Sequence, residues 1–309
     1  MFKTLIRPAM IFIPFVLGVL LPKAHLLNGE PFNAVRWSLV VMVFLSSLQI
    51  RFSDLRPRRE HWILLGVNVL MGLIPYFLLN NLLPGHQMLA LAAFFVGITP
   101  TATAAPVVIA FLNGRIGFAL TGFTISNVFI SIFLLGLLPM VTGNLTLGFI
   151  GNVAVTLAEV IALPFALSLA VRKLYPRARE WPKHCKTFSF SLWSFTLFVI
   201  AAVARQHFID HPNESLFEVL AIGGISLAIC IANFSIGRAL APRRYSRESS
   251  QLLGQKNTTF SMYLALHYAG ALVAMGPIFY VLWHNCWNAW QMYSYDRRRA
   301  IRKARSRGR

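Results

Sequence analysis

The feature that most constrains this chain is a series of ten apolar segments of membrane-spanning length, separated by short stretches rich in charge, Pro or Gly. To within a few residues, the segments cover 5–22, 34–51, 61–83, 87–113, 115–141, 147–171, 187–205, 216–240, 247–269 and 271–291. Of the 309 residues, 56% are hydrophobic and only 13% are charged, which excludes a soluble globular enzyme. We therefore expect an all-α polytopic membrane protein with ten transmembrane helices.

The distribution of basic residues supports this layout and gives it an orientation. Cytoplasmic loops of membrane proteins are enriched in Lys and Arg. Ten segments put both termini on one side, and 25 of the 29 Lys and Arg residues fall on that side. Lys23, Arg36 and Arg205 fall on the other side, and Lys256 falls inside the ninth segment. We expect an integral protein of a bacterial inner membrane with both termini cytoplasmic. The net charge of +19 then reflects this asymmetry and not nucleic-acid binding.

Two sequence echoes indicate an internal repeat. The stretch IPFVL at 13–17 recurs as LPFAL at 163–167, which argues against a cleaved signal peptide in the first segment. A polar, helix-breaking stretch begins at Gly97 in the fourth segment, and another begins at Gly254 in the ninth. Because five segments separate the copies, the second copy is inverted, as in many secondary transporters. The expected units are a first five-helix repeat over 1–145, an inverted repeat over 146–291 and a basic cytoplasmic tail over 292–309.

The first break, at 97–106, reads GITPTATAAP. Pro100 and Pro106 each remove a backbone donor and disturb the preceding turn. Non-helical backbone at this depth must be buried in protein or line a cavity. A simple proline kink satisfied by Thr hydroxyls is the alternative. We expect Thr101, Thr103 and Pro106 to contribute to a substrate-binding cavity.

The second break, at 254–259, reads GQKNTT and places five consecutive polar side chains in mid-segment. Such residues are expensive in hydrocarbon and are tolerated where they face water, substrate or one another. An ordinary loop between two short helices is the alternative, but it would spoil the alternation of basic loops. We expect Asn257 and Thr258 to bind substrate. The N-terminal ends of broken helices suit an anionic substrate.

Three features of the chain form one pattern: the two breaks, Leu112-Asn113-Gly114 at the end of the first break, and the late Trp283-His284-Asn285. This pattern resembles the bile acid:sodium symporter family over nearly the whole chain. The resemblance implies a panel of helices 1, 2, 6 and 7 and a core of helices 3–5 and 8–10. It also implies that helices 4 and 9 are discontinuous and cross. Members of this family carry organic anions, from bile-acid-like molecules to small carboxylates and sulfonates, by alternating access.

The chain departs from the family where many members bind sodium. Family positions with a Ser-Asn pair, small hydroxyl residues, a Glu and two Gln residues correspond here to Ala105, Pro106, Ala119, Phe123, Leu252, Lys256 and Leu70. Sodium is a hard cation that prefers oxygen ligands, so most of its side-chain ligands are missing. Gly254 and Asn257 do match the family pattern. We expect no cofactor, and sodium coupling stays open.

Lys256 offers a replacement for the missing ion, because its ammonium would supply the positive charge from within the chain. Glu159 is the only acidic residue near the middle of a segment, and the resemblance puts it on the panel, opposite Lys256 on the core. A pair that forms and breaks during transport would allow proton exchange. In the alternative, Glu159 bonds a neighbouring helix and Lys256 snorkels to a water-filled vestibule.

Three further residues complete the expected ion or proton coupling set. Gln255 lies next to Lys256 in the second break, and Asn127 in the fifth segment is expected to face the first break. His267 could relay protons, because histidine titrates near neutral pH. The alternatives are interhelical hydrogen bonding for Asn127 and packing for His267.

A secondary active transporter of an organic anion accounts for most of these features. A non-transporting receptor or scaffold, and a sodium symporter with backbone carbonyl ligands, are the alternatives. A channel would need a continuous polar stripe, which the segments outside the two breaks do not show. An enzyme is not expected, since no span carries a nucleophile–base pair or a metal-ligand cluster. The remaining expected partner is the lipid bilayer, whose anionic headgroups would attract the basic tail.

Overall fold

The structure is a computed structural model that describes residues 13–20, 31–50, 55–210 and 216–307. Its described helices are α2 (Pro31–Ser47), α3 (Arg59–Leu82), α4 (Gln87–Ile98), α5 (Ala104–Phe111), α6 (Ile116–Thr142), α7 (Leu147–Leu157), α8 (Leu163–Leu174), α9 (Trp181–His184), α10 (Lys186–Asp210), α11 (Leu216–Leu240), α12 (Ser246–Gly254), α13 (Thr258–Tyr268) and α14 (Ala271–Arg307). A π-helical turn, Ala158–Ala162, joins α7 to α8, and a 3-10 turn, Pro176–Glu180, precedes α9. These ranges contain no β-strand.

The expected helical membrane protein is confirmed at this level. Within the described ranges, five helices are long and apolar enough to cross a membrane, namely Arg59–Leu82, Ile116–Thr142, Leu147–Leu174, Thr187–Asp210 and Leu216–Leu240. Asn33–Ser47 and Gln87–Ile98 are shorter apolar helices. The first expected segment, 5–22, lies largely outside the described residues. Ten spans and an inverted repeat therefore stay predictions.

Both expected helix interruptions are present. Helix α4 ends at Ile98, two residues before Pro100, because the residue before a proline is driven out of the helical region. Helix α5 begins at Ala104, so five residues between the two helices are not helical. Helix α12 ends at Gly254, and α13 begins at Thr258 after the N-cap Asn257, whose side chain accepts the N–H of Phe260 at 3.4 Å.

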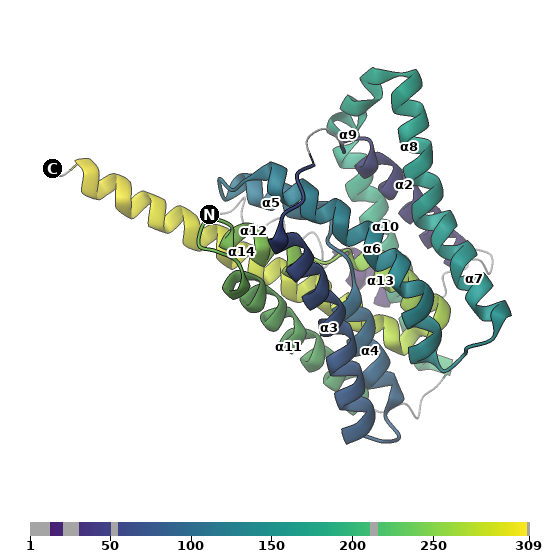
Figure 1. Ribbon diagram of the computed structural model, residues 1–309. Helices are drawn as coiled ribbons and strands as arrows, with labels where there is room; N and C mark the ends of the chain where they lie inside the picture. The colour runs from purple at the N-terminus through teal and green to yellow at the C-terminus, as the bar shows by residue number, and fades with distance from the viewer. Residues whose placement is uncertain (1–12, 21–30, 51–54, 211–215, 308–309) are drawn as a thin grey trace.

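The expected basic tail, 292–309, is helical over most of its length. Helix α14 continues without interruption from the last expected segment to Arg307, and it projects well beyond the bundle (Figure 1). The sequence explains this length, because neither Gly nor Pro occurs between Pro277 and Gly308. Arg and Ala, which are frequent in this part, are good helix formers.

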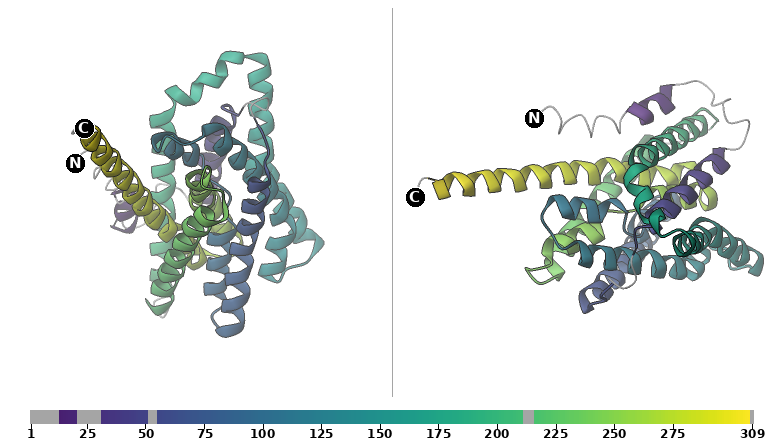
Figure 2. Two further views of the ribbon diagram at one scale, coloured as in Figure 1. Left: turned by 60° about the vertical axis from the view of Figure 1, so that its left-hand side comes forward. Right: turned by 90° about the horizontal axis from the view of Figure 1, so that it is seen from above.

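Helix α4 occupies the interior of the bundle, and every residue from Leu89 to Ile98 is buried. It packs against α3, α11, α13 and α14, whereas α2 packs against α8 and α10 (Figures 1 and 2). Glycines allow the close approach of α3 and α4. A Cβ at Gly97 would meet the backbone carbonyl of Met71, and one at Gly72 would meet Ile98. This contact brings Asn68 of α3 to the end of α4.

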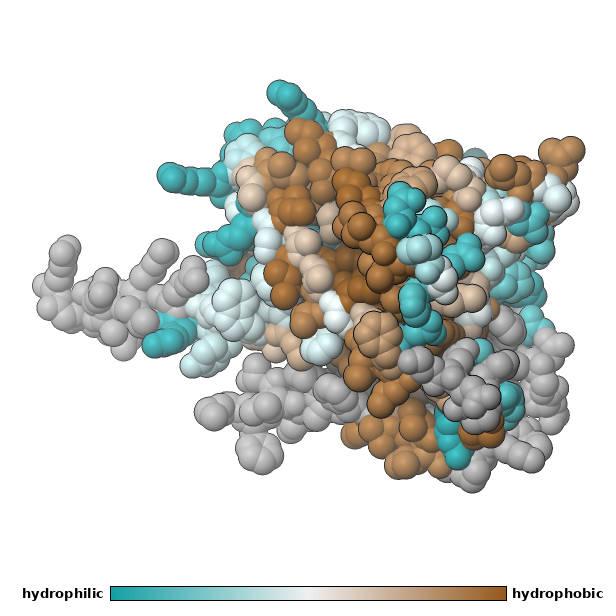
Figure 3. Space-filling view, turned by 90° about the horizontal axis from the view of Figure 1, so that it is seen from below, coloured by the Kyte–Doolittle hydropathy of each residue, from teal (hydrophilic) through white to brown (hydrophobic). Residues whose placement is uncertain are grey.

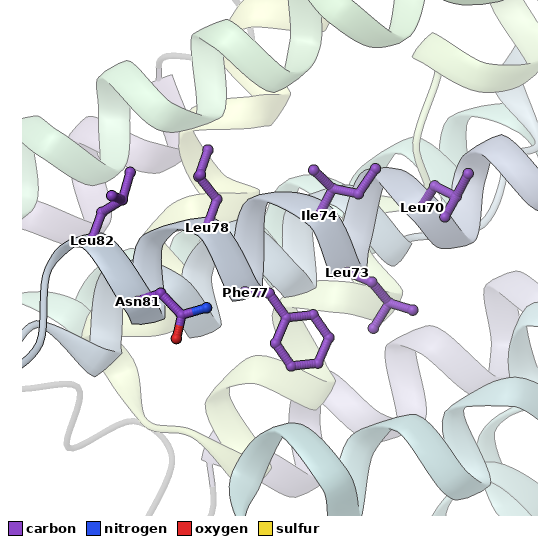
Figure 4. A pocket seen from close by; sticks show the side chains of 7 residues that line it. All are labelled: Leu70, Leu73, Ile74, Phe77, Leu78, Asn81 and Leu82. Atoms are coloured by element: carbon purple, nitrogen blue, oxygen red, sulfur yellow. The ribbon is translucent and has the colours of Figure 1, made fainter.

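Apolar side chains cover much of the face shown in Figure 3. One hollow, of about 520 Å³, is lined by Leu70, Leu73, Ile74, Phe77, Leu78, Asn81 and Leu82, all from α3 (Figure 4). Most of these side chains are exposed, and only Asn81 is polar. An exposed apolar surface of this kind suits contact with lipid and offers no convergent polar groups to a substrate.

Candidate functional site

The two helix interruptions meet and run antiparallel to each other. The N–H of Ala102 donates to the carbonyl of Gln255, and the N–H of Asn257 donates to the carbonyl of Pro100, each at 2.8 Å. Between these bonds, Thr101 and Lys256 form an isolated antiparallel bridge. The backbone groups that each helix loses at its break are therefore partly satisfied by the other break.

Lys256 lies at the C-terminal end of α4 with only 1% of its surface exposed. Its ammonium donates to the side-chain oxygen of Asn68 and, at 2.9 Å, to the carbonyl of Gly97. The last carbonyls of a helix carry partial negative charge and favour a cation. Neither of the two ion pairs in the described part of the chain includes Lys256. A helix end and an amide thus surround this ammonium in place of a carboxylate.

Asn68 completes the end of α4. Its amide nitrogen donates to the carbonyls of Ile98 at 3.1 Å and Thr99 at 3.2 Å, while its oxygen accepts from Lys256. The side chain is 4% exposed. A buried polar group is costly unless it is bonded, so the amide and the helix end stabilise each other. We did not expect Asn68 in the site, although an amide near the middle of the apolar segment 61–83 is a signal that could have identified it.

Thr101 is held by two other helices. Its N–H donates to Ser126 Oγ at 3.1 Å, and its hydroxyl donates to the carbonyl of Leu252 at 2.6 Å. Asn127 donates to the carbonyl of Thr101 at 2.9 Å. The expectation that Asn127 faces the first break is therefore met. These bonds fix the first break against α6 and α12.

We call the place where the two helix interruptions meet the crossing. A cavity of about 10 Å³ lies beside it. Its lining is His61, Leu64, Leu65, Asn68, Thr101, Gly122, Ser126, Leu252 and Leu253. A volume of this size is at the lower limit for a single water molecule. This cavity is therefore too small for an organic molecule in this conformation.

The other expected substrate residues lie at the starts of α5 and α13. Thr258 is buried, and Asn257 is half-buried as the N-cap of α13. Pro106 is buried in the first turn of α5. Thr103, the N-cap of α5, is exposed, and its side chain does not cap the helix. The structure thus brings Thr101, Asn257 and Thr258 to one crossing and leaves Thr103 at its surface.

The expected pair of Lys256 and Glu159 is not formed in this conformation. Glu159 instead accepts a bond from the Arg36 guanidinium at 2.9 Å. The reason is the packing of α2, which carries Arg36, against the π-helical turn that carries Glu159. His267 is exposed and stacks on Tyr263, with ring centroids 5.8 Å apart.

Gln255 belongs to a buried amide network that the sequence did not reveal. Its side-chain oxygen accepts from Asn288 of α14, whose own oxygen accepts from Gln251 at 3.0 Å. Gln251 also donates to Gln291 at 2.5 Å. This network ties the second break to α14. No group of three His, Cys, Asp or Glu side chains suited to a metal ion occurs in the described ranges.

Comparison of the sequence with known protein families finds no match, and comparison with curated proteins finds none either. The resemblance to the bile acid:sodium symporter family therefore stays an expectation drawn from this chain's own motifs.

Proposed function

We propose that the chain is a secondary active transporter that moves an organic anion across a membrane by alternating access. The observation that carries this proposal is the antiparallel contact of two interrupted helices at Thr101 and Lys256. In secondary transporters, broken helices that meet in this way present free backbone groups to substrates and ions. The proposal includes ten spans in inverted repeats, as the resemblance to the bile acid:sodium symporter family implies.

The polarity of the helix ends favours an anion. Helices α5 and α13 begin at the crossing, and the start of a helix offers unpaired N–H groups and partial positive charge. Thr101, Thr103, Asn257 and Thr258 provide polar side chains at these starts. We propose a carboxylate or sulfonate as the group that binds there. Because the present cavity is so small, substrate must enter after the helices around the crossing move apart.

Lys256 acts, in this proposal, as a resident cation that makes sodium unnecessary. The rival form of the function is a symporter that binds sodium through backbone carbonyls. Such a sodium site would use the backbone carbonyls at the C-terminal end of α4, which are those of Gly97, Ile98 and Thr99. They already accept bonds from Lys256 and Asn68, which favours transport without sodium.

The setting we propose is a bacterial inner membrane, with both termini in the cytoplasm and the basic end of α14 near anionic headgroups. Lipids and the transported anion are then the partners of the chain, and no catalytic role is proposed. A receptor or scaffold that binds an anion without moving it is the second candidate.

Counterflow in proteoliposomes tests the proposal. A panel of labelled carboxylates and sulfonates is offered to the native chain with sodium and with choline in its place. We expect flux of at least one anion, equal in the two buffers. We expect Asn257→Leu to reduce that flux at least about tenfold, whereas Asn144→Leu, in an exposed loop, leaves it unchanged. Binding without flux would favour the receptor, and flux only with sodium would favour the symporter.

A further inference from the structure

Three arginines gather around one aromatic ring at the start of α12. The guanidinium carbons of Arg58, Arg115 and Arg244 lie 5.5, 5.1 and 4.7 Å from the ring centroid of Tyr245. They come from three separate parts of the chain: the residue before α3, the residue before α6 and the loop between α11 and α12. All three are exposed, whereas Tyr245 is buried. We call these three residues the arginine triad.

The charges of the arginine triad are not neutralised by ion pairs. Both ion pairs of the described residues lie elsewhere. One carboxylate, that of the buried Glu248, is close by, but it accepts the backbone N–H of Arg115 at 2.8 Å. Each guanidinium lies within 5.5 Å of the Tyr245 ring centroid, and like charges gathered around one ring repel one another. Their arrangement becomes favourable when an oxyanion accepts bonds from the guanidinium groups.

A group of apolar side chains lies between the arginine triad and the crossing. Tyr245 stacks on Phe118, with centroids 4.4 Å apart and planes inclined by 11°. Both rings pack with Leu64, Leu252 and Leu253. The same three leucines line the small cavity beside Thr101 and Asn68. The ring stack therefore stands between the triad and the crossing.

We propose that the arginine triad is an oxyanion-binding site at the mouth of the transport route, closed at its base by the Tyr245–Phe118 stack. The ligand is the carboxylate or sulfonate of the transported molecule, so this inference rests on the proposed function. Guanidinium groups suit such ligands because their planar donors match the two oxygens of an oxyanion. A lipid phosphate shares this chemistry, and the experiment separates the two sources.

The first measurement is binding of radiolabelled sulfate to the purified full-length chain in neutral detergent at fixed ionic strength. The variant Arg58→Gln/Arg115→Gln/Arg244→Gln should bind sulfate at least about tenfold more weakly than the native chain. The control Arg59→Gln/Arg177→Gln/Arg243→Gln removes the same charge from exposed arginines that have no contact with the Tyr245 ring in the structure. It should stay within about twofold of the native affinity. Equal losses in both variants, or none in either, would overturn the site.

The second measurement separates the lipid source. The unfolding temperature is compared in nanodiscs of phosphatidylglycerol and of phosphatidylcholine. Equal unfolding temperatures in the two lipids, together with sulfate binding in detergent, support a soluble anion as the ligand of the arginine triad. A rise in phosphatidylglycerol that the triad variant loses, without sulfate binding, would overturn that assignment. If the triad variant does not fold, Arg244→Gln alone should weaken sulfate binding about threefold, and an unchanged affinity would refute the site.

The outcome is also separable from that of the proposed function. Sulfate binding at the arginine triad requires no transport. Sulfate binding with no flux of any organic anion would refute the carrier and leave the site. Flux with an unchanged KM and sulfate affinity in the triad variant would refute the site and leave the carrier.

Discussion

The two helix interruptions share a backbone pattern but differ in what their side chains supply. Each break donates one N–H to a carbonyl of the other, through Ala102 and Asn257. The first break, between α4 and α5, has no ionisable side chain, whereas the second carries Lys256. The Lys256 side chain extends to the C-terminal end of α4, whereas no side chain of the first break carries a charge. The pattern of backbone bonds is therefore reciprocal, while the charge of the site comes from one break alone.

The largest effect should follow from removing that charge. Lys256→Met keeps an unbranched apolar stem and deletes the ammonium, so counterflow should fall at least about 100-fold. The protein should stay folded, because the loss of two bonds is offset by the loss of a buried charge. Lys173→Met, an exposed lysine on α8, is the control and should transport normally. Transport by Lys256→Met at the native rate would show that the charge is not needed.

The close approach of α3 and α4 gives the next effect. Gly97→Ala adds a methyl group against the backbone carbonyl of Met71, which cannot move alone, and should destabilise the protein by about 3 kcal/mol. Gly66→Ala is the control on α3, since nothing lies within 4 Å of its added methyl. It should raise stability by up to about 1 kcal/mol. Thermal unfolding in detergent measures both, and equal shifts would contradict the packing described.

Asn68 tests how the first break is supported from α3. Asn68→Leu removes the partner of the Ile98 and Thr99 carbonyls and leaves the Lys256 ammonium with only the carbonyl of Gly97, so it should cost about 2 kcal/mol. Asn81→Leu removes an exposed amide from the same helix and should change little. Chemical unfolding of the two variants compares them. If Asn81→Leu lowers the stability as much as Asn68→Leu does, the bonds of Asn68 to the end of α4 do not explain its effect.

The smallest effect is expected at Glu159. Its bond to Arg36 is partly exposed, with 31% and 43% of the Arg36 and Glu159 side chains accessible, so Glu159→Gln should cost about 0.5 kcal/mol or less. Counterflow should change less than about twofold. The conservative variant Glu159→Asp is the control for side-chain shape. A transport loss as large as that of Lys256→Met would restore the pair of Glu159 and Lys256 as a step of the cycle.

The interruptions were predictable because their signals are local. Pro100 and the run of polar residues after Gly254 disfavour a helix wherever they occur in a chain. The ends of the long helices followed from apolar length, and 216–240 coincides with α11. Apolar length does not predict how far α14 continues beyond 291, because charge ends a membrane span without ending a helix.

The partners of the site residues were less predictable because they depend on which helices meet. Asn68 and Lys256 are 188 residues apart, and no local pattern links them. Glu159 was expected to meet Lys256, but the packing of α2 places Arg36 beside it. The arginine triad was visible in the sequence only as basic loops, since its convergence on Tyr245 requires three chain segments to meet.

The continuous helix α14 also has a mechanical consequence. With 37 residues it is a rod roughly 55 Å long. Its beginning packs beside α4, α11 and α13, and its far end stands clear of the bundle (Figure 2). A rod clamped at one end amplifies angle into displacement, so a slight tilt of the helices around the crossing becomes a swing of several ångström at Arg307. A spin label or fluorophore at the end of α14 would therefore report a small tilt of these helices as a large displacement.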